Sequence, residues 1–258
     1  MSSRKFLMDK GRLIQLFSKL DGLLKENDET LEFWVSGGAS MCLHLQTRHA
    51  THDIDASPLG GDKNVVETLR LQRYADKLSK MFNLPSNWLN VGGNMHITEP
   101  MKKTSVLGFK GSRLTVHLLD WQSMLVLKIM AYREQPDITD AVAIIRKYNV
   151  QNADEIYEWM KNLRPDWMHM GSMQQIKNML KEAWDTPETP YIKLRTLLDT
   201  YGFRDKTVNY YTALILDTHE DSLFDDDDYE EAISLFYKWK EDLLGEDNNE
   251  DFPESNQF

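Results

Sequence analysis

The chain has 258 residues, of which 41% are hydrophobic, and a formal net charge of −11 from 41 acidic and 30 basic residues. This length allows about two domains of ordinary size, and the acidic balance argues against broad nucleic-acid binding through a basic face. The N-terminus lacks a signal-peptide pattern, no segment has the ~18 apolar residues of a membrane span, and Cys42 is the single cysteine. We therefore expect a cytoplasmic protein without disulfides or a membrane partner.

The first part of the chain predicts alternating helices and strands. Leu13, Phe17, Leu20 and Leu24 recur three and four residues apart, which is typical of an amphipathic helix. The expected elements are, in chain order, a helix over 9–26, a strand over 31–36, a short helix from Ala39, a strand over 50–56, a helix over 63–82, an irregular segment over 84–103, and a hairpin with strands over 104–109 and 114–119. Such a hairpin makes the sheet mixed, so the fold class is α+β.

The first strand leads into the sequence Ser36-Gly37-Gly38-Ala39-Ser40. Glycines in this turn permit close backbone approach, and a helix that begins there directs its amide N–H groups toward an anion. A glycine pair alone more often forms a plain turn. At the end of a strand and the start of a helix it favours a triphosphate site, with the candidate residues Ser36, Gly37, Gly38 and Ser40.

Two aspartates follow fifteen residues after Gly38, in the sequence Asp53-Ile54-Asp55. Residues i and i+2 of a strand project to the same side, so the two carboxylates lie together while Ile54 faces the core. Carboxylate oxygens suit Mg²⁺, and no cluster of histidine or cysteine favours zinc. An Asp-x-Asp pattern also occurs at solvated strand ends, but its place after the glycine turn favours a magnesium site.

These motifs resemble those of the polymerase-beta-like nucleotidyltransferase superfamily. More narrowly, the chain is similar to the AbiEii-like and minimal nucleotidyltransferases (MNT) of bacterial toxin-antitoxin and abortive-infection systems. The matching residues are Gly37, Gly38, Arg48, Thr51, Asp53, Ile54, Asp55, Lys128, Arg133, Asp137 and Asp140. The segment Leu84–Asn90 is also similar to one in this branch, so the resemblance covers residues from about 31 to 148.

The resemblance implies transfer of a nucleoside monophosphate from a nucleoside triphosphate to an acceptor. It implies two Mg²⁺ ions at Asp53 and Asp55, catalytic roles for Lys128 and Asp140, and nucleotide contacts from Arg48, Lys128 and the glycine turn. The acceptor would be tRNA or a protein. The implied role is that of a toxin of a toxin-antitoxin or phage-defence system, with a possible cognate antitoxin as partner.

Lys128 lies in an apolar helical segment. A lysine in that setting either reaches out to solvent or is aimed at a buried anion, and the resemblance favours a phosphate. Asp137 and Asp140 begin the next helix, where an N-cap and the helix dipole account for both. Because Asp140 matches the family's acidic residue, we assign it to orient Lys128 or the nucleotide.

Many members of the superfamily place a third acidic residue on a later strand. The expected strand over 114–119 contains none, and Asp120 follows it directly. Asp120 could reach the metal ions, but it also occupies the N-cap position of the next helix.

After Val150 the pattern is helical almost throughout, which predicts a C-terminal bundle. We expect three regions: a nucleotidyltransferase domain over 1–149, a helical domain over 150–245, and an acidic disordered tail over 246–258. The alternative function is a non-catalytic interaction or regulatory protein that kept the fold and uses its acidic helical domain for docking. The missing third acid favours this alternative, whereas the intact glycine turn and Asp-Ile-Asp argue against it.

Overall fold

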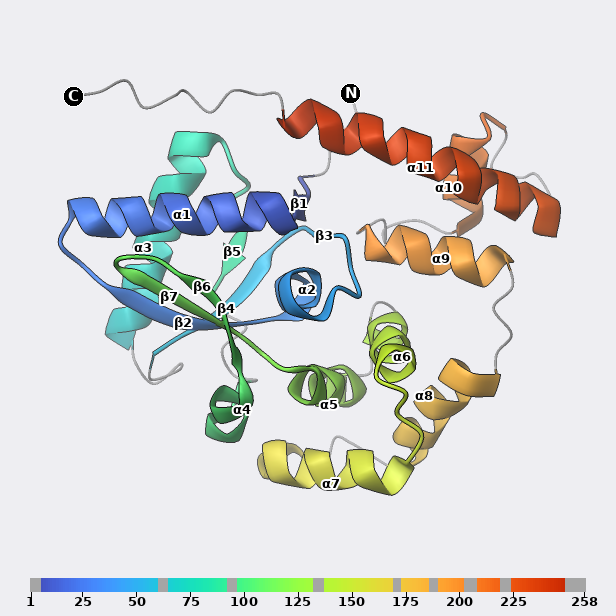
Figure 1. The fold of residues 1–258 in the computed structure, drawn as a ribbon, viewed down its shortest axis with the longest axis horizontal. Coiled ribbons are helices and arrows are strands. Elements are labelled where there is room, and N and C mark those ends of the chain that lie inside the picture. Colours follow the sequence, from blue (N-terminus) through green and yellow to red (C-terminus); the bar gives the residue numbers. More distant parts are fainter. Residues whose placement is uncertain are drawn as a thin grey trace. The chain divides into compact units, whose positions relative to one another are not determined.

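The computed structural model of the protein describes residues 6–59, 65–91, 97–131, 137–168, 173–185, 190–201, 208–218 and 224–248. The chain divides into two compact units, Met1–Thr186 and Pro187–Phe258. A mixed five-stranded sheet flanked by helices and a helical C-terminal region confirm the predicted α+β class (Figure 1).

The elements of the first unit follow the predicted order closely. They are β1 (Met8–Asp9), α1 (Lys10–Glu26), β2 (Leu31–Ser36), α2 (Gly37–Ser40), a π-helical turn (Met41–Leu45), β3 (Ala50–Thr51), β4 (Ile54–Pro58), α3 (Val65–Phe82), β5 (Leu89–Asn90), α4 (Glu99–Thr104), β6 (Val106–Lys110), β7 (Leu114–Leu118), α5 (Trp121–Ala131), α6 (Asp137–Lys147), α7 (Ala153–Leu163), a 3₁₀ turn (Pro165–Trp167) and α8 (Met173–Asp185).

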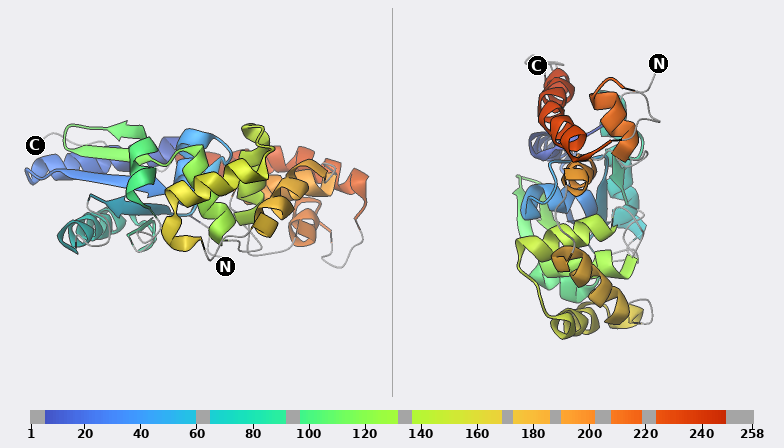
Figure 2. Two further views of the ribbon diagram at one scale, coloured as in Figure 1. Left: turned by 90° about the horizontal axis from the view of Figure 1, so that it is seen from below. Right: turned by 90° about the vertical axis from the view of Figure 1, so that its right-hand side faces the viewer.

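The strand order in the main sheet is β5-β4-β2-β7-β6. β2 pairs antiparallel with β4 and parallel with β7, β5 is parallel to β4, and β6 and β7 form the predicted hairpin. β1 and β3 form a separate antiparallel pair. Figures 1 and 2 show the hairpin at one edge of the sheet and α3 beside the other edge.

Side chains alternate between two environments along the strands. Phe33 and Val35 of β2 and Ile54 of β4 are fully buried in the core that α1 and α3 complete. Trp34, which lies between Phe33 and Val35, belongs instead to a second core with residues of α5, α6, α7 and α8. The sheet therefore separates two apolar layers, and Ser36 and Asp55 lie on the same side as Trp34 because residues two apart share a face.

The segment over 84–103, which we expected to be irregular, contains β5 and α4. Trp88 explains the order at β5, since its ring is fully buried and its Nε1 donates to the carbonyl of Ala75 at 3.1 Å. The backbone N–H of Ile54 donates to the carbonyl of Trp88 at 2.9 Å, which joins the segment to the edge of the sheet. Gly92-Gly93, interpreted as a loop, lies outside the described residues.

The second unit consists of α9 (Pro190–Thr200), α10 (Val208–Ile215) and α11 (Asp226–Asn248). Leu194, Leu198, Tyr211 and Phe236 belong to its own apolar core. We expected a domain boundary at 149/150. The division falls after Thr186 instead, because α7 and α8 pack with α5 and α6 in the first unit. Residues 246–248 of the expected disordered tail continue α11, and the rest of that tail lies outside the described residues.

Cys42 is a buried free cysteine in the same apolar core as Phe33 and Val35. Burial raises the pKa of its thiol to about 12, so the side chain stays protonated and behaves as a small apolar group, as expected. Within the part of the chain that the structure describes, no helix is long and apolar enough to cross a membrane.

The turn of the β6–β7 hairpin is held by Asp21 of α1. Its carboxylate accepts hydrogen bonds from the backbone N–H groups of Ser112, Arg113 and Leu114 at 3.0, 2.7 and 2.8 Å. A Cβ atom on Gly111 would lie 2.3 Å from the Asp21 Cγ, so glycine is required for this approach. Burial opposes ionisation of Asp21, but these hydrogen bonds outweigh it and lower the pKa of the carboxyl group below 3.8.

We predict that Asp21→Ala lowers the free energy of unfolding by about 2 kcal/mol at pH 7, because three backbone donors lose a charged acceptor. Since the folded state holds the pKa below the unfolded value of 3.8, the contribution is present above pH 3.8 and is lost as the pH falls through the lower folded value. Urea unfolding at several pH values measures this difference. Glu26→Ala, an exposed site on the same helix, is the control and should change stability little; a pH-independent loss in Asp21→Ala would contradict the prediction.

Candidate active site

The glycine turn lies directly against one of the two predicted metal-binding carboxylates. β2 ends at Ser36, and Gly37 has a φ of +64°, a conformation that side chains with a Cβ atom rarely adopt. A Cβ atom on Gly37 would also lie 2.4 Å from Oδ2 of Asp55. Glycine is therefore required at position 37 both for the turn and for the close approach of Asp55.

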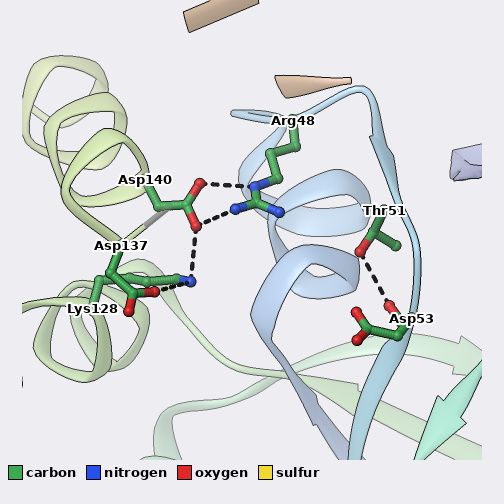
Figure 3. A network of polar contacts seen from close by, with 6 residues as sticks. All are labelled: Arg48, Thr51, Asp53, Lys128, Asp137 and Asp140. Carbon is green, nitrogen blue, oxygen red and sulfur yellow. Dashed lines mark hydrogen bonds and ion pairs between the residues drawn. The ribbon is translucent and has the colours of Figure 1, made fainter. Parts of the chain in front are cut away.

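Gly38 is packed closely against Thr51 and Arg48. A Cβ atom there would lie 2.2 Å from Oγ1 of Thr51 and 3.0 Å from Nη1 of Arg48. Thr51 in turn donates from Oγ1 to the backbone carbonyl of Asp53 at 3.1 Å (Figure 3). The structure thus brings together both glycines, Arg48, Thr51 and the Asp-Ile-Asp segment. The spacing of the motifs predicted the glycine turn beside Asp-Ile-Asp, and the resemblance matched Arg48 and Thr51.

Asp53 precedes β4 and Asp55 lies within it, and both are half-buried, whereas Ile54 between them is fully buried. In the sheet, Asp55 is paired with Ser36 of β2 on one side and with Asn90 of β5 on the other. Nδ2 of Asn90 donates to Oδ1 of Asp55 at 3.3 Å. The sequence prediction that Ile54 enters the core is confirmed. Asp55 lies in a row of three paired polar residues, Ser36, Asp55 and Asn90, on neighbouring strands.

Lys128 does not reach toward solvent but is buried in a network of charges. Its Nζ lies 2.8 Å from Oδ1 of Asp137 and 2.8 Å from Oδ2 of Asp140. Arg48 donates from Nε to Oδ1 of Asp140 at 2.8 Å and from Nη2 to the other oxygen of the same carboxylate. Figure 3 shows Asp140 between the two cations. All four side chains are less than one tenth exposed, and their formal charges balance.

This network answers one question that the sequence left open. The Lys128 side chain is buried against the carboxylates of Asp137 and Asp140, whereas the resemblance favoured a phosphate as its anion. Asp140 contacts both Lys128 and Arg48, and its role in orienting Lys128 or a nucleotide stays a prediction. The contact of Asp137 with Lys128 was missed, because a helix cap explained Asp137 fully from sequence. Arg133, which the resemblance also matched, lies outside the described residues.

Ser40 and Asp120 have structural contacts of their own. Ser40 is fully buried, and its Oγ donates to the carbonyl of Leu119 at the end of β7 at 3.0 Å, so its hydroxyl joins the helix to the sheet. Oδ1 of Asp120 accepts from the backbone N–H of Ser123 at 2.7 Å, which confirms the N-cap interpretation. Ser36 is buried at the N-cap of α2 and makes no side-chain capping hydrogen bond there.

The strand expected over 50–56 is interrupted at residues 52–53, so Asp53 lies just before β4 and Asp55 lies within it. Both carboxylates supply hard oxygen donors, and the backbone at Gly37 approaches the carboxylate of Asp55 closely. This donor chemistry fits a magnesium ion. No group of three or more histidine, cysteine, aspartate or glutamate side chains that could hold a metal occurs among the residues described by the structure. Among the described residues, a ligand beyond the two aspartates would come from another residue type, and water or phosphate oxygens would complete the shell.

A glycine turn packed against Asp55 of an Asp-x-Asp segment in a mixed sheet is the arrangement that the resemblance to nucleotidyltransferases led us to expect. Residues 11–186 match the family described as nucleotidyltransferase of unknown function (DUF6036), and the chain belongs to this family. No curated protein and no solved structure matches the chain. The matched region ends at the last residue of the first compact unit, so the second unit lies outside it.

We predict that Lys128→Met lowers the free energy of unfolding by about 3 kcal/mol, because two buried carboxylates then lose the cation that lies 2.8 Å from each. Lys128→Met/Asp137→Asn should be less destabilised than the two single changes add up to, since the second change restores neutrality. Urea unfolding of the set measures the coupling. Lys177→Met, at an exposed position of α8, is the control; additive effects would mean that the buried charges do not depend on one another.

Proposed function

We propose that the protein transfers a nucleoside monophosphate from a nucleoside triphosphate to an acceptor, with Mg²⁺ as cofactor. Membership of a nucleotidyltransferase family supports nucleotide transfer in general. The observation that carries the proposal is the contact of the Gly37 backbone with the Asp55 carboxylate, where a Cβ atom would approach Oδ2 to 2.4 Å. A nucleotide held at the turn would have its phosphates beside Asp55.

Asp53 and Asp55 would hold the magnesium ions, two in the full catalytic complex. When bound, Mg²⁺ would lower the pKa of the acceptor oxygen and neutralise charge on the leaving pyrophosphate. The backbone N–H groups at Gly37 and Gly38 would bind phosphate oxygens, since they begin the helical segment that α2 and the following π-helical turn form. We assign no phosphate contact to the Ser40 hydroxyl, because it is buried against Leu119.

Arg48 and Lys128 would act through the charge network. Asp140 binds Nε and Nη2 of Arg48, while Nη1 lies 3.0 Å from the position that a Cβ atom on Gly38 would take. The guanidinium would therefore stabilise negative charge at the turn without leaving its carboxylate partner. Lys128 would fix the position of Asp140, which in turn holds Arg48 beside the glycine turn.

We propose the AbiEii-like or minimal nucleotidyltransferase branch as the closest functional class, with a toxin role in phage defence. The acceptor would be tRNA or a protein, and a cognate antitoxin would be a partner. The acidic net charge of −11 favours a protein acceptor, whereas a tRNA acceptor predicts binding that weakens steeply with salt.

A non-catalytic interaction protein is the second candidate. It is favoured by the finding that no group of three acidic, histidine or cysteine side chains suited to a metal lies within the described parts of the chain, and by the two carboxylates that already neutralise Lys128. Calorimetry with each triphosphate and Mg²⁺ separates the candidates. The non-catalytic alternative predicts no metal-dependent nucleotide binding.

We predict that Asp53→Asn and Asp55→Asn each reduce transfer of labelled nucleotide at least a hundredfold, because each change removes an anionic ligand of the magnesium site. The melting temperature should change little, since both side chains are half-buried near the protein surface. The assay incubates the protein with each labelled triphosphate and total tRNA or cell lysate, and identifies the macromolecule that acquires label.

Asp76→Asn, an exposed site on α3, serves as the matched control and should leave transfer unchanged. Full activity in either active-site variant would refute the assignment of the metal site.

A further inference from the structure

Three polar residues lie in register across the sheet beside the glycine turn. Ser36 of β2 is paired with Asp55 of β4, and Asp55 is paired with Asn90 of the parallel strand β5. Side chains at paired positions project from the same face and start about 5 Å apart. Asn90 is therefore next to Asp55 on the face that carries the candidate site.

Asn90 is held in this position by the residues that precede it. The ring of Trp88 is buried and hydrogen-bonded to Ala75, and the carbonyl of Trp88 accepts from the backbone N–H of Ile54. Leu89, paired with Ile54, is also buried. The backbone at Asn90 is thus fixed to the start of β4, while its side chain is exposed and donates from Nδ2 to Oδ1 of Asp55 at 3.3 Å.

We infer that Asn90 is a third protein ligand of the cation at Asp53 and Asp55, through its amide oxygen. This inference rests on the proposed function. An asparagine amide has a carbonyl oxygen and an NH₂ group on the same carbon, and its last torsion angle is broad and roughly two-fold. A half-turn about the Cβ–Cγ bond replaces the N–H that now faces Asp55 with an oxygen of the type that hard cations accept.

The same side chain would then have two states. Without a cation, the amide N–H donates to the Asp55 carboxylate. With a cation, the amide oxygen joins the carboxylates as a ligand. An amide ligand leaves the three-residue set with a formal charge of −2, whereas a third aspartate would give −3. Because ligand charge sets cation affinity, Asn90 makes the site weaker than a three-carboxylate site.

The test measures Mn²⁺ binding to the full chain by electron paramagnetic resonance, without nucleotide. We expect Asn90→Leu, which keeps the size but lacks the oxygen, to weaken Mn²⁺ binding about tenfold, and Asn90→Asp to tighten it about tenfold. Asn87→Leu, at an exposed position in the preceding turn, is the matched control and should bind like the unmodified protein. Asn90→Asp preserves shape and polarity, so it tests the inference even where Asn90→Leu fails to fold.

Equal Mn²⁺ affinity in the unmodified protein and both Asn90 variants, together with loss of binding in Asp55→Asn, would overturn the role of Asn90 and leave the metal site intact. Absence of Mn²⁺ binding by the unmodified protein would overturn it as well. If Mn²⁺ affinity follows residue 90 as expected but no triphosphate donates a nucleotide, the inference stands and the proposed transfer fails.

Discussion

Burial of charge is the constraint on which the first unit depends. Arg48, Lys128, Asp137 and Asp140 are all removed from water, and any one of them without its partners would cost several kcal/mol. Arg48 belongs to the loop before β3, whereas the other three belong to α5 and α6. Their mutual neutralisation therefore joins the loop that carries Arg48 to helices that follow it by about eighty residues or more, and it fixes which face of α6 lies toward Arg48.

The second constraint is steric. The absent side chains of Gly37 and Gly38 leave the space in which Asp55, Thr51 and Arg48 lie. Backbone atoms of the turn, rather than mobile side chains, thereby set the positions of the carboxylate and the guanidinium. Such rigidity favours electrostatic stabilisation of a reacting phosphate, because the charges need no rearrangement when the reaction occurs.

The sequence predicted the features that depend on local pattern and failed on those that depend on long-range pairing. Helix periodicity located α1 and α3, and the Gly-Gly and Asp-x-Asp motifs located the site. A two-residue strand such as β5 is too short to show periodicity, so the sequence could not predict that Asn90 pairs with Asp55. The partner of Lys128 was also hidden, because a lysine in an apolar helix indicates a buried anion without saying which one. The packing of α7 and α8 with the first unit depends on tertiary contacts in the same way.

The charge network also bears on the order of events during synthesis. A chain that has emerged only as far as α5 contains the glycine turn, Asp53 and Asp55, but it lacks Asp137 and Asp140, the carboxylates that pair with Arg48 and Lys128 in the folded protein. Two uncompensated cations would keep that core open to water until α6 docks. The nascent chain would therefore be unable to complete the surroundings of its glycine turn until most of the first unit has been made.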